Sequence, residues 1–272
     1  MRDTIILLSG GMASFEASIR IIKKKRYGVR LWFFDTLIED EDLYRFLNDI
    51  GYFLNVNIEY YCDGRNPWQV FRDERYIGNT RADVCSRVLK RELLTKELKK
   101  QYPNGNVNLV FGVDWTEMHR IKPINDNWNA LGVTTSFPLV ESPYFLYKDY
   151  RKSLEEKEIK VPRLYSLGFS HNNCGGACVK AGITQWLKVL EYFPLRYKWH
   201  EEMEQALRKD LKKDISILRN RRNNKTRSMT LKYLRWRNIE SSGTIKKQFD
   251  TMELIDEACG CFIPMYNESL IE

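Results

Sequence analysis

TIILLSGGMAS, residues 4–14, is the stretch of this sequence that decides the fold. Its first half, Thr4 to Leu8, is a short apolar run of the kind that forms a buried strand in a parallel sheet. Two glycines follow directly, and the side chains beyond Ser14 recur at helical spacing. A strand, a glycine turn and a helix in this order are typical of the start of an α/β fold. The inward face of the expected helix holds Phe15, Ser18, Ile19 and Ile22.

The following residues continue the alternation of strands and helices. It predicts an α/β fold with a parallel, twisted sheet of about five strands and helices on both faces. Ligands of such sheets bind at the carboxyl ends of the strands. We expect the further strands at residues 29–34, 56–61, 107–113 and 134–139, and the helices between them at 40–53 and 84–98.

After about Tyr144 the pattern changes to charged segments, a turn region rich in Gly and Asn, and helices. We therefore expect an α/β domain at residues 1–165 and a smaller helical, cysteine-containing domain at 166–272. The helix through Trp186 is expected to end at Pro194. Further helices are expected at 198–214 and 226–236.

Composition limits the class of protein. With 272 residues, 43% hydrophobic and 29% charged, the chain is typical of a globular protein. The apolar run near the start has only five residues, which is too short for a signal peptide, and no run reaches the length that spans a bilayer. We expect a cytoplasmic protein without a membrane partner. In a reducing cytoplasm, six cysteines indicate metal binding or catalysis rather than disulfides.

The loop Ser9–Ser14 has the chemistry of a phosphate cradle. Glycines let the backbone turn tightly and point several N–H groups at one place, and the helix N-terminus adds positive potential. Ser9 and Ser14 supply hydroxyl hydrogen bonds. An ordinary glycine turn between a strand and a helix is the alternative, and the strand–SGGxxS–helix order favours phosphate binding.

The loop resembles that of the PP-loop ATP pyrophosphatase superfamily, which reads SGGxDS. Within it, the sequence resembles the PAPS-reductase-like branch, which includes members carried by phages. The resemblance implies that residues 1–165 bind ATP with Mg²⁺ and cleave it between the α and β phosphates, with the nucleotide held by the loop residues. Ala13 stands where the family has Asp, which leaves open whether catalysis is retained. The implied loop residues are Ser9, Gly10, Gly11, Met12, Ala13 and Ser14.

Three further segments extend the expected nucleotide site. Asp35-Thr36 ends the second strand, and a similar Asp-Thr lies beside the nucleotide in the PAPS-reductase-like branch. The stretch RADVCSRVLKRE, residues 81–92, resembles the Cys-x-x-x-Leu-Lys segment of the family. There, Arg87 and Lys90 would neutralise phosphate, and Cys85 is either a thiolate with a lowered pKa or a structural cysteine.

The third segment follows the fourth strand and begins at Gly112. Its acidic residues are candidates for holding Mg²⁺ or orienting the acceptor, and its basic residues for contacting phosphates; a structural role for the histidine is the alternative. These candidates are Asp114, Glu117, His119 and Arg120.

Four cysteines form two closely spaced pairs, Cys174/Cys178 and Cys259/Cys261, with glycines between them. Two such pairs are what a tetrahedral metal or an iron–sulfur cluster needs, so we predict one shared site. Spacing alone leaves Zn²⁺ and [4Fe–4S] open. The resemblance to sulfur-transferring PP-loop enzymes favours the cluster.

Residues 219–237 crowd eight basic side chains around Tyr233 and Trp236. Basic side chains neutralise nucleic-acid phosphates and aromatic rings stack on bases, while a solvated helix face is the alternative. With a net charge of +8 and a pI near 9.1, we lean to a nucleic-acid substrate.

Three functions follow from these patterns. The favoured one is an ATP-dependent adenylating enzyme that acts in nucleic-acid or nucleotide modification or in sulfur transfer. The alternatives are a reductase of the PAPS or APS type and a non-catalytic module that binds an adenine nucleotide. A homodimer is also among the expectations. The acceptor is not given by the sequence.

Overall fold

The computed structural model describes residues 2–25, 27–78, 83–222 and 225–240. Contacts divide these residues into two units. The sheet unit consists of residues 2–65 and Ser86–Gly175, and the helical unit consists of Asn66–Cys85 and residues 176–240. Each unit is described by itself. Within the described residues, no helix combines the length and the apolar character needed to cross a membrane.

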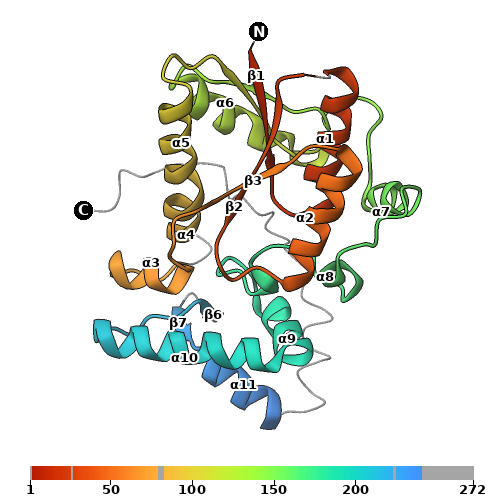
Figure 1. Cartoon of the computed structure of the whole chain (residues 1–272). Coiled ribbons are helices and arrows are strands. Elements are labelled where there is room, and N and C mark those ends of the chain that lie inside the picture. Colours follow the sequence, from red (N-terminus) through yellow and green to blue (C-terminus); the bar gives the residue numbers. More distant parts are fainter. Residues whose placement is uncertain (1, 26, 79–82, 223–224, 241–272) are drawn as a thin grey trace. The chain divides into compact units, whose positions relative to one another are not determined.

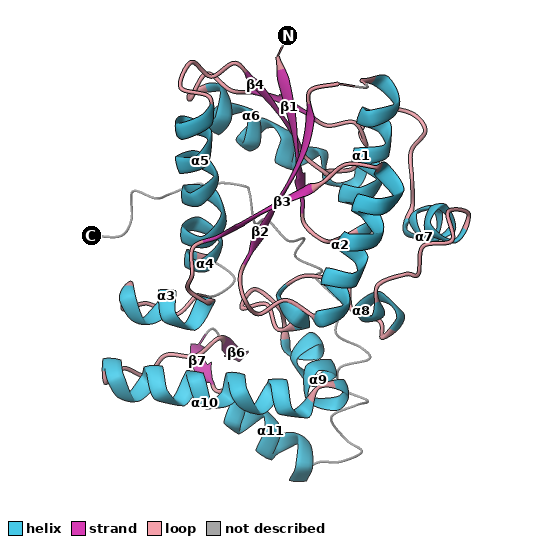
Figure 2. Cartoon of the chain, viewed as in Figure 1, coloured by secondary structure: helices cyan, strands magenta, loops and turns pink. Residues whose placement is uncertain are grey.

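The sheet unit contains five parallel strands, as the alternation predicted, and their order is β3-β2-β1-β4-β5 (Figures 1 and 2). The central strand pairs through Leu8 with Phe33 on one side and through Ile6 with Val110 on the other. The strands are β1 Asp3–Leu8, β2 Val29–Asp35, β3 Ile58–Cys62, β4 Val107–Val110 and β5 Thr134–Ser136.

Helices cover both faces of this sheet. Alternate residues of β1 and β2, such as Ile6 and Phe33, form one core with α1 (Met12–Lys24) and α2 (Glu41–Leu54). Their neighbours, such as Ile5 and Trp32, are equally buried and point to the opposite face. Figure 1 shows α5 (Leu93–Gln101) and α6 (Ile121–Asn129) on that side. After β1 the chain therefore adds β2 and β3 on one side of this strand, and then β4 and β5 on its other side. Folds of this type bind ligands at the point where the strand order reverses in this way.

Shorter helices complete the sheet unit and its borders. The segment expected as one helix at 84–98 contains a π-helix, a form that is often found at functional sites. The bounds are α4 Val84–Ser86, η1 Arg87–Glu92, η2 Trp115–Arg120, α7 Tyr147–Glu155, α8 Arg163–Ser166 and η3 Cys174–Gly176.

The helical unit is built around α10 (Pro194–Leu211), which contacts α3, α9 and α11. Its core is aromatic: Trp186, Tyr197 and His200 are each at most 2% exposed. Pro194 ends one helix and starts the next, because proline is well tolerated at the first position of a helix. The other elements are α3 Pro67–Asp73, α9 Ile183–Tyr192, β6 Leu218–Arg222, β7 Lys225–Met229 and α11 Leu231–Glu240.

The helix expected at 226–236 is wrong in its first part, since β6 and β7 form an antiparallel hairpin there. A buried carboxylate on α10 holds both ends of the hairpin segment. Glu204 accepts the N–H groups of Ile217 at 3.0 Å and Leu231 at 2.7 Å. These bonds fix the backbone before β6 and after β7, so the helix can begin only at Leu231.

Candidate functional site

The loop between β1 and α1 is closed by its own hydrogen bonds. The Ser9 hydroxyl donates to Ser14 Oγ at 3.2 Å, and the Ser14 hydroxyl donates to the Gly11 carbonyl at 2.8 Å. The backbone N–H groups of Ser9 and Gly11 point to Ser14 Oγ and Ser9 Oγ, both at 3.3 Å. Bonds of this length are at the weak end of the range, so the same donors can turn to an anion. The two hydroxyls and two amides thus gather at the N-terminus of a 13-residue helix.

Glycines make this geometry possible at two places. Gly10 has φ +75°, and an added Cβ would lie 2.6 Å from Leu43 of α2. Gly112, after β4, packs against the start of α1, where an added Cβ would lie 2.8 Å from Ser14 Cα. A larger residue at Gly112 would therefore push the end of β4 away from the loop. Because Gly112 has no side chain, the end of β4 and the start of α1 lie in close contact.

Asp35 and Thr36 lie at the end of β2, as predicted. Asp35 accepts the Leu37 N–H at 2.7 Å and the Tyr44 hydroxyl at 3.0 Å. Burial and the neighbouring Asp35 charge raise the pKa of Tyr44, so the phenol stays protonated as a donor. Thr36 donates to the buried carboxylate of Glu39 at 2.8 Å, and the Cys174 N–H donates to the other oxygen of Glu39.

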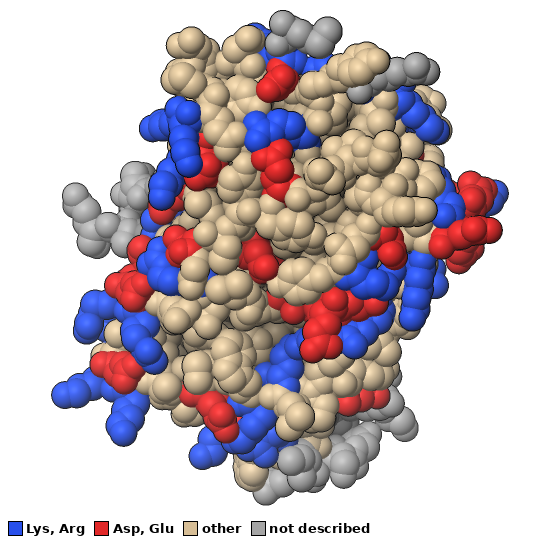
Figure 3. Space-filling model, in the orientation of Figure 1, with Lys and Arg blue, Asp and Glu red and all other residues tan. Residues whose placement is uncertain are grey.

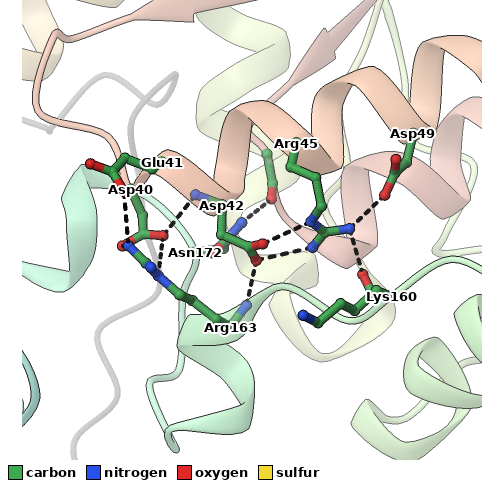
Figure 4. A network of polar contacts seen from close by, with 9 residues as sticks. Asp40, Glu41, Asp42, Arg45, Asp49, Lys160, Arg163 and Asn172 are labelled. Carbon is green, nitrogen blue, oxygen red and sulfur yellow. Dashed lines mark hydrogen bonds and ion pairs between the residues drawn. The ribbon is translucent and has the colours of Figure 1, made fainter.

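The acidic start of α2 binds two arginines (Figure 4). Asp40 caps the helix by accepting the Asp42 N–H at 3.0 Å and pairs with Arg163 at 2.8 Å. Asp42 accepts the Arg163 N–H at 2.7 Å and pairs with Arg45. The hydrogen bond from Arg45 lowers the pKa of Asp42. Arg163 and Arg45 therefore neutralise the carboxylates at the start of this helix.

Asp114 is the N-cap of η2 and accepts the Thr116 N–H at 2.9 Å, the Thr116 hydroxyl at 2.6 Å and the Tyr150 hydroxyl at 3.2 Å. Burial and the Asp114 charge raise the pKa of Tyr150. Glu117 pairs with Arg120, and His119 is exposed. Tyr150, on α7, therefore helps to hold the Asp114 carboxylate in place.

The segment that resembles Cys-x-x-x-Leu-Lys contributes the π-helix η1, which contacts β2. Lys90 is buried at 3% exposure and Arg87 pairs with Glu92 at 2.6 Å. Cys85 is half-buried and belongs to the helical unit, whereas Arg87 and Lys90 belong to the sheet unit. Arg81 lies outside the described residues.

The predicted metal site has two of its four cysteines in the described chain. Cys174 is buried in the sheet unit with φ +53°, and Cys178 is half-buried in the helical unit. Cys259 and Cys261 lie outside the described residues. Among residues that are described, no three His, Cys, Asp or Glu side chains are grouped closely enough to hold a metal ion. The four-cysteine site therefore stays a prediction.

The basic segment forms the hairpin β6–β7 and the start of α11. Arg219 and Arg227 are exposed on the hairpin, and Tyr233 and Trp236 are 43% and 50% exposed on α11. The centroids of the two rings lie 5.7 Å apart. Acidic and basic side chains are interspersed over the face drawn in Figure 3.

Asn172 and Glu39 are parts of this site that the sequence patterns do not predict. Asn172 is buried and donates from Nδ2 to the Gly10 carbonyl at 2.8 Å. No local signal could have found it, because the two residues are 162 positions apart. Glu39 lies before the cap residue Asp40 and accepts hydrogen bonds from Thr36 and the Cys174 N–H.

Two solved structures are similar to this chain at low sequence identity. No family model and no curated protein matches the sequence. One similar solved structure is phosphoadenylyl-sulfate (PAPS) reductase from Candida auris in a phosphate complex, with 15% identity and a TM-score of 0.47 over 63% of this chain and 81% of that chain. Another is the NH3-dependent NAD synthetase from Campylobacter jejuni subsp. jejuni NCTC 11168 in complex with the nitrate ion, with 14% identity and a TM-score of 0.40 over 77% of this chain and 84% of that chain.

Proposed function

We propose that this protein is an ATP-dependent adenylating enzyme whose phosphate site is the loop Ser9–Ser14. The observation that carries this proposal is the group of two hydroxyls and two backbone amides at the N-terminus of α1, beside the place where the chain changes direction in the sheet. Such a group is electropositive without a charged side chain, and it matches the oxygens of a pyrophosphate.

The reaction proceeds by attack of a nucleophilic acceptor on the α-phosphorus. A bond forms between acceptor and phosphorus, the bond to the bridging oxygen of the β-phosphate breaks, and pyrophosphate leaves with that electron pair. Ser9, Gly11 and Ser14 hold the outer phosphates and stabilise the charge that grows on the leaving group. Catalysis follows because these donors are already in place before the reaction.

Mg²⁺ would accompany ATP. Mg²⁺ usually takes one or two carboxylates and completes its shell with phosphate oxygens and water. Asp114 fits this role best, because its position at a strand end is held by Thr116 and Tyr150. The ion would neutralise phosphate charge. Ala13, where the family has Asp, removes one further carboxylate from the loop.

The proposal is tested by pyrophosphate release from ATP, with the S14A variant compared with S18A. Ser14 Oγ both accepts from Ser9 and donates to the Gly11 carbonyl, so we expect S14A to lower the rate at least about tenfold. Ser18 is buried one turn further along α1 and bonds only to the Ser14 carbonyl, so S18A should stay within about twofold. Equal rates in both variants would remove the loop from the reaction.

The same assay separates the two alternative functions. Binding of ATP without pyrophosphate release would indicate a non-catalytic nucleotide-binding module. Ala13, which stands where the family loop has Asp, is the feature that favours this alternative. A reductase would release sulfite from PAPS in the presence of a thiol donor. That reaction needs a nucleophilic cysteine near the C-terminus, where the cysteines stand as the pair Cys259/Cys261.

We further propose nucleic acid as the class of acceptor, bound in part by the helical unit. The exposed pair Tyr233/Trp236 offers a surface on which bases stack, and Arg219 and Arg227 offer charges for phosphates. We expect W236A to weaken binding of a single-stranded oligonucleotide about tenfold, as the loss of one stacking partner does. Fluorescence anisotropy at two salt concentrations measures it.

The control for W236A is Y52A, because Tyr52 is 93% exposed on the sheet unit and has no basic cluster around it in the sequence. Oligonucleotide affinity that falls equally in both variants, or in neither, would contradict the proposed binding surface. Metal analysis of protein purified without oxygen tests the predicted cysteine site, since iron and zinc give distinct results.

A further inference from the structure

Asn172 reaches the phosphate loop from a distant part of the sheet unit. It lies between α8 and η3, is 2% exposed, and donates from Nδ2 to the Gly10 carbonyl at 2.8 Å (Figure 4). An amide that is assigned the other way round would place its oxygen against this carbonyl and repel it. Donation from Nδ2 is therefore the orientation that the geometry allows.

This hydrogen bond fixes the direction of a backbone amide in the cradle. The Gly10 carbonyl and the Gly11 N–H belong to one planar peptide unit and point to opposite sides of it. Holding the carbonyl toward Asn172 therefore holds the N–H toward the Ser9 side of the loop. That N–H lies 3.3 Å from Ser9 Oγ, at the weak end of hydrogen bonding, and is available to an anion.

The loop needs such a hold because its backbone is permissive. Gly10, at φ +75°, has no Cβ to restrict rotation of the peptide that follows it. If this peptide turned over, the carbonyl oxygen would enter the place intended for phosphate and repel it. A bond on the carbonyl raises the cost of that rotation.

The second polar atom of Asn172 has no comparable task. Within the described chain, its Oδ1 is buried without a hydrogen-bond partner. An unpaired buried acceptor lowers stability, so packing alone does not account for an amide at this position. A buried polar atom without a hydrogen-bond partner is expected at functional sites rather than in ordinary cores.

The segment that carries Asn172 is itself fastened on either side. Arg163 binds Asp40 and Asp42 at the start of α2, and the Cys174 N–H donates to Glu39. The position of the Asn172 amide is thus set by contacts that do not involve the loop. A fixed donor at a fixed place is what a positioning residue requires.

We propose that Asn172 is a positioning residue of the phosphate loop, which keeps the peptide between Gly10 and Gly11 turned so that its N–H faces the nucleotide. This inference rests on the proposed function for the identity of the ligand. It predicts that Asn172 determines affinity for the phosphates and leaves affinity for the nucleoside unchanged.

Isothermal titration of N172D and N172L with pyrophosphate, ATP and adenosine tests the proposal. Aspartate has the shape of asparagine but cannot donate, and its charge faces the carbonyl, so we expect affinity for pyrophosphate and ATP to fall about 30-fold. Leucine removes the donor without adding charge, and we expect about a tenfold loss. Adenosine, which has no phosphate, should bind all three proteins within about twofold. Equal losses for adenosine and ATP would assign Asn172 to general packing and overturn the proposal.

S153A is the matched control. It removes a buried side-chain hydrogen bond of the same unit, from Ser153 to Glu16 at 3.0 Å, and leaves the bond from Asn172 to Gly10 in place. We expect its affinity for ATP to stay within about twofold of wild type. A loss as large as that of N172L would mean that general loosening of the sheet unit, not the Asn172 amide, lowers the affinity.

Hydrogen exchange of the Gly11 amide gives a reading without ligand. We expect exchange to quicken at least about tenfold in N172L, because the peptide is released to turn. If wild type bound neither pyrophosphate nor ATP, the proposed function would fail while this measurement still decided the role of Asn172. Unchanged exchange at Gly11 would overturn the positioning role even if ATP bound well.

Discussion

The G10A variant is expected to bind ATP at least about 100-fold more weakly than wild type. Gly10 has φ +75°, a conformation that costs an L-residue about 1–2 kcal/mol. The added Cβ would also lie 2.6 Å from Leu43 Cδ1 and 2.7 Å from its Cγ, so the buried Leu43 side chain, α2 or the loop must shift. Movement of the loop turns the amides of the cradle away from the phosphates. Titration with ATP and with pyrophosphate measures the loss.

Gly132 provides a control for the backbone part of this effect. It has φ +74°, nearly the same as Gly10, but an added Cβ would meet nothing within 4 Å. G132A should therefore lose about 1–2 kcal/mol of unfolding free energy and keep its ATP affinity. G10A should lose about 1–3 kcal/mol more, because overpacking adds to backbone strain. Loss of ATP binding in both variants, or in neither, would contradict the arrangement described for the loop.

His200 is expected to make the helical unit sensitive to acid. Its Nδ1 accepts the indole N–H of Trp68 at 2.9 Å, so the imidazole is neutral. Burial, with a smaller contribution from the charge of Arg196, lowers the pKa of His200 from 6.5 to about 3. In the unfolded chain this histidine regains an ordinary pKa near 6.5.

The sign of the effect follows from proton binding. Between pH 6.5 and about 3 the unfolded chain takes up a proton at this residue and the folded chain does not, so stability falls as the pH falls. The loss approaches about 1.4 kcal/mol per pH unit, or about 4 kcal/mol over the window. Above pH 6.5 His200 contributes no pH dependence.

Urea unfolding of wild type and H200N at several pH values between 7.5 and 4 measures this contribution. Asparagine offers Trp68 an acceptor but does not titrate, so the variant should be less stable at pH 7.5 and lose less stability on acidification. H119N is the control for the loss of a histidine, because His119 is exposed whereas His200 is buried. Parallel curves for wild type and H200N would refute the prediction.

The sequence was sufficient for the sheet because its signals are local. The apolar runs at 4–8, 29–34 and 107–113 and the glycine turn after Leu8 specify buried strands and the first crossover without reference to distant residues. The sheet has the five parallel strands that this alternation predicted. The helix α3 was missed although Asn66, Pro67 and Gln69 form a capping box that can be recognised in a sequence.

The hairpin β6–β7 could not be predicted in the same way. Six of the eleven residues 226–236 are good helix formers, but the backbone on either side of the hairpin is held by Glu204, which lies on another element. The same limit applies to the site. Ser9 and Ser14 are marked by the loop pattern, whereas Asn172 and Glu39 are recognised only through partners that are distant in the sequence.

The path of the chain determines how the protein can be dissected. The helical unit takes α3 from the first half of the sequence and its remaining helices from the second half. A chain ended after residue 165 would keep Trp68 and Phe71 but lose α10, including the histidine that accepts the indole N–H. Such a fragment would present bare aromatic surface and self-associate. An isolated sheet unit therefore calls for two excisions, with a short linker in place of Asn66–Cys85, rather than one stop codon.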